Sequence, residues 1–310
     1  MAVIERPPAS TSTMLGAAAA LSVVGIWATW LISMRYSRGG MLTPLDLSLL
    51  RFGIPALVLS PFLRRTGLWP RSAGTLPLVL MIVGAGAPFF QVAAFGLHAT
   101  PASAAGVLLP GTMPLATALI GMLVLGERPD RMRKIGMLAI LAGGLMLLIG
   151  TASGAALTWR SYLVLPFGAV LWAVYTHAFR RSGLGAFEAG ALICFWSTVI
   201  NLPLIPLMGS NLLVAPVSEI ALQIVPQGLL SGLLATVLYG IGVRMLGATK
   251  AAAYTAVTPV AGRRSDRWSR IAGGTSGRTD DRSDIRHRAR RPAVNGIAVA
   301  AAHVKARCRF

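Results

Sequence analysis

The chain has 310 residues, of which 55% are hydrophobic and 13% are charged, and its mean hydropathy is +0.66. A soluble globular domain carries about 25% charged residues, so this composition argues against an ordinary soluble protein and indicates a polytopic membrane protein. The formal net charge of +19 suggests a nucleic-acid-binding protein at first. The basic residues, however, lie in short loops between apolar runs and in a C-terminal stretch, and the loop charges belong to membrane topology.

Eight apolar runs are long enough to cross a membrane as helices, because a hydrocarbon core of about 30 Å takes roughly 20 residues. None has the alternating pattern of a membrane barrel strand, so the sequence predicts an all-α polytopic membrane protein. A ninth run begins near residue 251 and loses its apolar character after Ala261. The predicted spans are 14–34, 43–63, 75–97, 102–125, 134–150 (at 17 residues near the lower limit), 161–179, 186–208 and 220–243.

The Lys and Arg residues between these runs predict the orientation in the membrane. With the N-terminus in the cytoplasm, twelve of them lie on the cytoplasmic side, whereas Arg35, Arg38 and Arg160 lie on the other side. This bias predicts an integral protein of a bacterial-type inner (plasma) membrane with a cytoplasmic N-terminus. The twelve are Arg6, Arg64, Arg65, Arg71, Arg128, Arg131, Arg133, Lys134, Arg180, Arg181, Arg244 and Lys250.

Parts of the sequence occur twice. Ala99-Thr100 and Ala248-Thr249 are each followed, at matching distances, by two alanines and a proline, and the two copies are 149 positions apart. In the same way Trp27 and Arg35 parallel Trp172 and Arg180, with an offset of 145. Asp46 and Pro61 parallel Glu188 and Pro203, with an offset of 142. Small drifts in offset are what loop insertions produce.

Each copy corresponds to five helices, and because five is odd, the second copy enters the membrane from the opposite side. The sequence therefore predicts two inverted five-helix repeats on a ten-helix plan, with the last one or two helices disrupted after about residue 260. The predicted parts are a cytoplasmic N-terminal segment (1–13), a first repeat (14–150), an incomplete second repeat (161–260) and a basic, disordered, aberrant tail (261–310).

Three short motifs resemble a known family. Leu109-Pro110-Gly111, Leu125-Gly126-Glu127 and Ala142-Gly143-Gly144 are similar to the proline-bearing helix, the Leu-Gly-Glu turn and the glycine-rich last helix of the EamA domain, which belongs to the drug/metabolite transporter superfamily. The resemblance implies a ten-helix membrane carrier, often an exporter of amino acids or other small metabolites. It covers 14–150 well and 161–260 moderately.

The second repeat departs from this pattern. By analogy with Pro110 and Glu127, a Gly-Glu turn should follow Pro259 by seventeen residues, but Ser276 stands there and arginines fill the interval. One hypothesis is a shifted reading frame. The rival is a native basic tail, since residues 261–310 hold 12 Arg, one Lys and four Asp.

Arg51 is the strongest candidate for a functional residue. It lies eight residues into the second span, about 12 Å along a helix that rises 1.5 Å per residue. A charge at that depth is costly and normally faces a cavity or a partner. We expect either a counter-charge for a carboxylate or phosphate of a substrate, or a structural role in which Arg51 snorkels outward or pairs with Asp46.

Other candidates for the substrate path are aromatic, proline and amide residues. Trp27, Trp30, Trp172 and Tyr175 occupy symmetric places and could form aromatic walls, or pack and anchor the helices. Pro110 and Pro259 lie inside helical runs, where they could form hinges or static kinks. Gln91 could bind substrate or join helices. The candidates are Arg51, Trp27, Trp172, Tyr175, Gln91, Pro110 and Pro259.

Several polar and small residues are assigned structural roles. His177 could relay protons, but an interfacial position is the simpler expectation. Glu127 is interpreted as part of a solvated turn. Gly136, Gly143, Gly144 and Gly150 suit close helix contact.

Three functions remain open. The first is a secondary transporter (permease) of small metabolites, with a small-molecule substrate and the lipid bilayer as its partners. The second is a non-functional truncated remnant, and the third is a nucleic-acid or anionic-lipid binder acting through the basic tail, which we rank last. The sequence contains no enzyme motif, and its two cysteines, Cys194 and Cys308, suggest no disulfide framework or zinc site. We therefore expect no enzyme activity, cofactor, metal or nucleic-acid partner.

Overall fold

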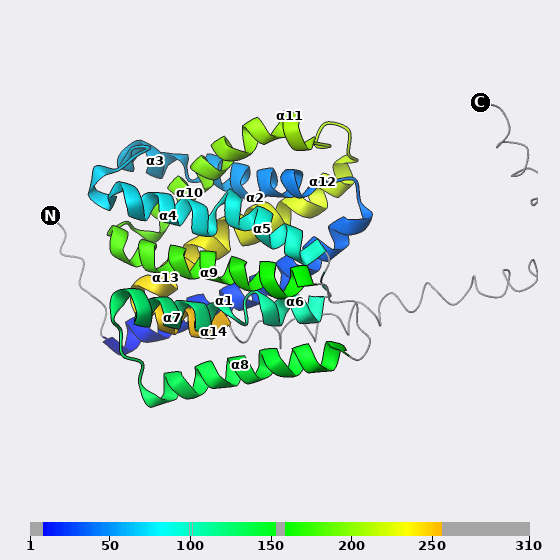
Figure 1. The fold of residues 1–310 in the computed structure, drawn as a ribbon. Helices are drawn as coiled ribbons and strands as arrows, with labels where there is room; N and C mark the ends of the chain where they lie inside the picture. The colour runs from blue at the N-terminus through cyan, green and yellow to red at the C-terminus, as the bar shows by residue number, and fades with distance from the viewer. Residues whose placement is uncertain (1–8, 99, 101, 153–158, 256–310) are drawn as a thin grey trace, which may run out of the picture. The chain divides into compact units, whose positions relative to one another are not determined.

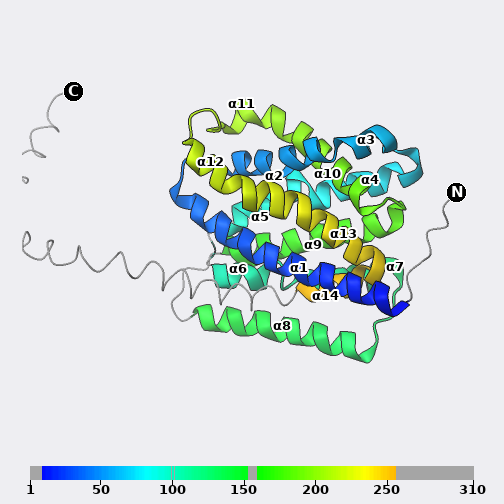
Figure 2. The same cartoon turned by 180° about the vertical axis from the view of Figure 1, so that it is seen from behind.

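The computed structural model describes residues 9–98, 100, 102–152 and 159–255. They all lie within residues 1–265, the first of the two units into which the chain divides. The described part is helical and contains no strand (Figures 1 and 2). The predictions made for Pro259 and for the tail 261–310 lie outside the described residues.

The first repeat predicted from the sequence contains eight α-helices. They are α1 (Ala9–Tyr36), α2 (Pro44–Val58), α3 (Ser60–Thr66), α4 (Thr75–Ala85), α5 (Ala87–His98), α6 (Ala102–Leu108), α7 (Met113–Leu125) and α8 (Arg131–Ala152).

The second repeat contains six α-helices and one π-helical segment in its described part. They are α9 (Trp159–Ser182), α10 (Ala186–Asn201), α11 (Ile205–Met208), α12 (Val217–Gln223), the π-helical segment η4 (Ile224–Leu234), α13 (Ala235–Leu246) and α14 (Ala248–Thr255). Short 3-10 turns lie at Ser37–Gly39, Arg71–Ala73 and Leu202–Leu204.

Six helical segments of the described chain are long and apolar enough to cross a membrane, which confirms six of the predicted spans. The span predicted at 43–63 is a bent pair, α2 and α3, with an angle of 64° between them. The bend falls where Pro61 enters the chain at the start of α3, since proline has no N–H to continue the helix. The fifth predicted span, 134–150, lies within α8 (Arg131–Ala152), a helix of 22 residues, of which Lys134–Met146 is the apolar part that could be assessed.

The first span of each half packs against the third span of the other half. Gly16 of α1 lies against Met245 and Leu246 of α13, so the start of α1 meets the end of α13. On the opposite side of the bundle, Gly84 of α4 and Gly96 of α5 lie against α9 at Leu171 and Leu165, again in antiparallel order. These two pairings are the most extensive in the described bundle, and small residues allow both close approaches.

The second spans of the two predicted repeats have the same kind of N-terminal cap and the same kind of break at their end. The side chain of Asp46 accepts a hydrogen bond from the backbone N–H of Thr43 (2.9 Å), which caps α2, and Glu188 accepts one from Gly185 (2.8 Å), which caps α10. Each helix then breaks next to a proline, α2 at α3 and α10 at the turn that contains Pro203. The residue pairs matched in the sequence therefore occupy equivalent places.

Two glycines bring the π-helical segment against α2. Gly228 and Gly232 of η4 face Leu50, Arg51, Ile54 and Pro55. Because Pro55 lacks an N–H, the carbonyl of Arg51 four residues earlier has no donor within its own helix, and it lies over the Cα of Gly232. A glycine at this position lets the two backbones approach closely.

Helix α8 lies at the edge of the bundle, next to α6 and α7 (Figures 1 and 2). Its apolar side chains are largely exposed; Met146, for example, is 74% exposed. The expectation that Gly136, Gly143 and Gly144 mediate close helix contact is wrong for the described residues, because a Cβ at any of them would meet nothing within 4 Å. The side of α8 that carries them has no described helix against it.

We predict that Gly232→Ala destabilises the fold. Its methyl group would overlap the carbonyl oxygen of Arg51 and lie 2.8 Å from Cγ of Pro55, and overpacking of this kind costs about 1–3 kcal/mol. The measurement is thermal unfolding of the purified protein in detergent. The control is Gly25→Ala on α1, where the new Cβ meets nothing and where replacing a helical glycine gains about 0.5–1 kcal/mol. Equal unfolding temperatures for the two variants would contradict the packing.

Candidate functional site

A small cavity lies beside α1 at Trp27–Leu31, within the first half, and Trp172 of α9 closes it from the second half. Its volume is about 10 Å³, which is room for about one water molecule. All of its lining residues are buried, so the structure is closed around it. They are Trp27, Trp30, Leu31, Arg51, Phe89, Leu109, Pro110, Met113 and Trp172.

The centre of the cavity wall is a contact between the two symmetric tryptophans. The ring centroids of Trp27 and Trp172 lie 4.9 Å apart in an edge-to-face arrangement, a favoured geometry for aromatic pairs. Tyr175 does not line the cavity but packs on Trp172 at 5.0 Å, and Tyr239 of α13 stacks on Trp27 at 5.8 Å. The hydroxyl of Tyr239 lies 3.0 Å from that of Thr176. This aromatic layer closes the side of the cavity that faces Arg180.

Arg51 lies in the cavity wall and is only 3% exposed. Its guanidinium carbon is 5.1 Å from the ring centroid of Trp30, 5.7 Å from that of Phe90 and 5.9 Å from that of Phe52. Such cation–π contacts favour the charge. Its Nε and Nη1 atoms are buried and have no acceptor in the described part of the chain.

The alternative in which Arg51 pairs with Asp46 is wrong. The carboxylate of Asp46 is occupied at the start of α2, where it accepts hydrogen bonds from Thr43 and from the hydroxyl of Ser210 (2.5 Å) and the backbone N–H of Asn211 (3.0 Å). Snorkelling is also wrong, since Arg51 is buried. Arg51 is thus a buried cation beside a cavity, with N–H groups free to bind an anion.

Pro110 lies where the fourth predicted span is irregular. α6 ends at Leu108, α7 begins at Met113, and the turn between them contributes Leu109 and Pro110 to the cavity. Thr112 donates to the carbonyl of Leu108 (2.7 Å) and so satisfies a polar group that the break would leave free. A broken helix at the cavity is typical of transporter binding sites.

Gln91 is not among the cavity residues. It lies on α5, partly buried, and its Nε2 atom has no acceptor in the described chain, so a role in joining helices is not supported. Sequence analysis missed Phe89, Leu109, Met113 and Tyr239. A signal existed for Tyr239, because it lies 149 positions after Phe90 and the ring pairs Trp30–Phe90 and Tyr175–Tyr239 are equivalent.

An arginine closes the end of the bundle where α1 ends, which we call the Arg38 end. Arg38 donates to the backbone carbonyls of Leu97 and, at 2.8 Å, of Thr100, at the end of α5. A second small cavity there, about 10 Å³, is lined by Leu31, Met34, Arg35, Arg38, Leu97, Thr100 and Ala105. Because Leu31 lines both cavities, they lie one behind the other along α1.

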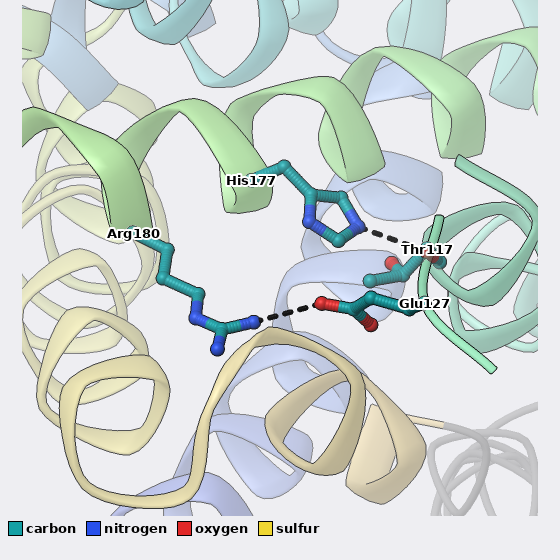
Figure 3. A network of polar contacts seen from close by, with 4 residues as sticks. All are labelled: Thr117, Glu127, His177 and Arg180. Carbon is teal, nitrogen blue, oxygen red and sulfur yellow. Dashed lines mark hydrogen bonds and ion pairs between the residues drawn. The ribbon is translucent and has the colours of Figure 1, made fainter. Parts of the chain in front are cut away.

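A polar network closes the opposite end, which we call the Arg180 end (Figure 3). Glu127, after the end of α7, forms an ion pair with Arg180 of α9 at 3.0 Å. His177, one turn earlier on α9, is 5% exposed, and its Nε2 atom lies 2.9 Å from the carbonyl oxygen of Thr117. Both contacts join α7 to α9.

One of the sequence interpretations at this end is incomplete. Glu127 is not simply a solvated turn residue, because the left-handed Gly126 (φ 67°) turns the chain back so that its carboxylate lies over Gly121. His177 is buried within the protein, and its position at the membrane interface stays a prediction. Only a residue without a side chain at 121 leaves room for both groups, since a Cβ there would lie 2.9 Å from Glu127 and 3.5 Å from His177.

Arg244 of α13 secures the end of α9 in the same region. It donates to the carbonyls of Phe179 (3.0 Å), Arg180 (3.2 Å) and Leu184, and its guanidinium carbon lies 4.5 Å from the ring centroid of Phe179. Cations are favourable at a helix C-terminus, where carbonyls lack partners. Beyond it, an open recess of about 350 Å³ is lined by Glu127, Arg128, Arg180, Leu246, Gly247, Ala248, Thr249 and Lys250.

The described residues contain no group of three or more His, Cys, Asp or Glu side chains that could hold a metal ion. Among the described residues, the polar side chains of the site hold helices together at two ends and leave Arg51 as an unpaired cation in the middle.

Comparisons with known proteins agree with this architecture. The model of the EamA-like transporter family matches residues 14–149. A crystal structure described only as that of a protein superposes with a TM-score of 0.62, at 22% identity, and the match covers 87% of this chain and 92% of that one. At this identity the likeness shows the fold alone. No curated protein matches the chain.

We predict that Glu127 and Arg180 stabilise the fold only as a pair. Their side chains are 29% and 51% exposed, and exposed pairs contribute about 0.2–1 kcal/mol. The measurement is a double-mutant cycle on unfolding with Glu127→Gln and Arg180→Gln. In the matched control, the neighbouring exposed Arg181→Gln should be additive with Glu127→Gln. Additive effects for Arg180→Gln as well would show that the ion pair contributes nothing.

Proposed function

We propose that the protein is a secondary transporter of small metabolites, because residues 14–149 match the model of the EamA-like transporter family, which belongs to the drug/metabolite transporter superfamily. In this proposal the substrate occupies the central cavity and crosses the bilayer by alternating access. Amino acids and related compounds are the substrates that we propose to test first, and export is the proposed direction.

The observation that carries the proposal is the depth of the cavity. Gly16 of α1 is level with the end of α13, and Arg38 lies just beyond the other end of α1. Trp27, in the cavity wall, lies eleven residues from each, about 16 Å at 1.5 Å per residue. The total of about 33 Å matches a hydrocarbon core of about 30 Å. A site at the midplane between two halves is the arrangement of secondary transporters.

We infer further that the two halves are inverted repeats. If the two halves are swapped, the pairing of α1 with α13 becomes the pairing of α9 with α4, and the reverse also holds. Arg35 lines the cavity at the Arg38 end, whereas its counterpart Arg180 lies at the other end. Trp27 and Trp172, the equivalent residues of the two first spans, touch each other, as residues next to a two-fold axis do. These observations support inversion, on which alternating access depends.

The closed cavity requires two gates in this proposal. Toward the Arg38 end, the path runs past Leu31 to the second small cavity. Toward the Arg180 end, it is blocked by the layer of Tyr175, Phe179 and Tyr239, each at most 2% exposed. The Arg180 end carries most of the Lys and Arg residues of the loops, which supports a cytoplasmic location for that end and for the N-terminus.

We predict that Trp172→Ala strongly slows transport. Loss of this ring removes the contact with Trp27 and opens the cavity wall, so we expect at least about a tenfold lower rate from lost positioning of the substrate. The measurement is exchange of labelled amino acids and related metabolites into proteoliposomes that contain the full chain. The matched control is Trp69→Ala, because Trp69 is 42% exposed and packs on Trp196 away from the cavity. If wild-type protein exchanged none of the compounds, or if Trp172→Ala were as active as wild type, the proposal would fail.

We predict opposite labelling at the two ends of the bundle. In a Cys194→Ala, Cys308→Ser background, a membrane-impermeant maleimide should react in intact cells with Met41→Cys, a residue 48% exposed beyond the end of α1. It should react with Arg181→Cys, an exposed residue at the end of α9, only after the cells are permeabilised. Labelling of both positions from one side would overturn the inverted arrangement.

A further inference from the structure

We propose that the central cavity binds the carboxylate of a small monoanion with an apolar body, and that Arg51 is the residue that recognises it. This inference rests on the proposed function, since it names the substrate class of the same cavity. It follows from the unpaired polar atoms of the cavity wall, which are all hydrogen-bond donors.

Arg51 differs from the other arginines described above, which are exposed at the two ends of the bundle. Arg38 and Arg244 donate to backbone carbonyls at helix ends, and Arg180 pairs with Glu127. Arg51 contacts three aromatic rings instead, and its Nε and Nη1 atoms, which carry three N–H groups between them, lack acceptors in the described chain. A buried cation without an anion or acceptor is costly, and an anionic ligand would remove that cost.

An indole N–H group in the same wall is also unpaired. Nε1 of Trp30 is buried without an acceptor in the described part of the protein, and Trp30 lines the cavity with Arg51. Guanidinium and indole nitrogens can only donate. A ligand that satisfies both side chains must therefore present several acceptor lone pairs, as a carboxylate or a phosphate does.

The charge and shape of the wall favour the carboxylate. Arg51 is the one charged side chain among the described residues that line the cavity, so it balances a single negative charge. A phosphate ester carries about −1.5 to −2 charges at pH 7 and would leave part of its charge uncompensated. The other lining residues, such as Phe89, Leu109 and Met113, are apolar and suit a hydrocarbon body.

The cavity is closed in this structure, so the ligand must enter when one gate opens. The rings around Arg51 keep its charge near the aromatic wall, where it is held by cation–π contact until the anion arrives. The neighbouring backbone is fixed by the contact between the carbonyl of Arg51 and Gly232. The guanidinium is thus placed by packing rather than by another charge.

The test is ligand binding to the purified full chain in detergent, measured by equilibrium dialysis. The probes are labelled phenylacetate, its neutral isostere phenylacetamide, and inorganic phosphate. We expect phenylacetate to bind at least about tenfold more tightly than the amide, as a charge-assisted bidentate contact allows. Phosphate should bind more weakly than phenylacetate.

Two variants and one control test whether Arg51 causes the preference for the acid over the amide. Arg51→Met should remove the discrimination between acid and amide, and Arg51→Lys should weaken phenylacetate binding about three- to tenfold, because an ammonium group lacks the planar fork. If Arg51→Met does not fold, the lysine variant decides. The matched control, Arg65→Met on the exposed side of α3, should bind as wild type does.

Each outcome bears on the inference separately from the transport proposal. The inference is overturned if phenylacetate does not bind, if the amide or phosphate binds as tightly, or if Arg51→Met keeps the preference. It stands if the preference depends on Arg51, even where proteoliposomes show no exchange, in which case the transport proposal alone fails. If Arg51→Met left the exchange rate unchanged, the transport proposal would stand and the proposed substrate class would be wrong.

Discussion

The contact between Trp27 and Trp172 is the interaction on which the centre of the protein depends. It joins α1 and α9, the first spans of the two halves, while each of these helices packs along a helix of the other half. Both tryptophans line the cavity together with Arg51 of α2. Such an arrangement of helices is stable in a bilayer because each long apolar helix forms its backbone hydrogen bonds internally.

Where the helices are interrupted, a specific neighbour completes the backbone hydrogen bonding or allows a close contact. Between α4 and α5, the first N–H of α5, that of Ala87, donates to the hydroxyl of Ser197 on α10 at 2.9 Å. In α2, the carbonyl freed by Pro55 meets the glycine of η4. In the turn between α6 and α7, Thr112 binds the carbonyl of Leu108. The interruptions are thus accommodated by side chains or glycines nearby, which is how membrane proteins tolerate irregular backbone near a site.

Hydropathy and residue spacing were enough to predict most spans, the symmetric tryptophans and Arg51, because these depend on local composition and on a repeat visible in the chain. Other features depend on residues far apart. The sequence does not reveal that Glu127 turns back over Gly121 to meet Arg180. It does not show that the carboxylate of Asp46 accepts hydrogen bonds from Ser210 and Asn211. Nor does it show that the glycines of α8 face no described helix. Each of these requires knowing which helices are neighbours, and hydropathy alone does not specify neighbours.

Arg38 and Arg244 join different parts of the chain from those joined by the ion pair of Glu127 and Arg180. Arg38 ties α1 to the end of α5 within the first half, and Arg244 ties α13 to the end of α9 within the second. Glu127 and Arg180 instead connect one half to the other through an exposed pair, which dissolved ions weaken. Dissolved ions therefore act on this link between the halves more than on the contacts of Arg38 and Arg244, whose partners are uncharged carbonyls. In the proposed transport cycle, the electrolyte at that face is thus a variable to which the connection between the halves responds.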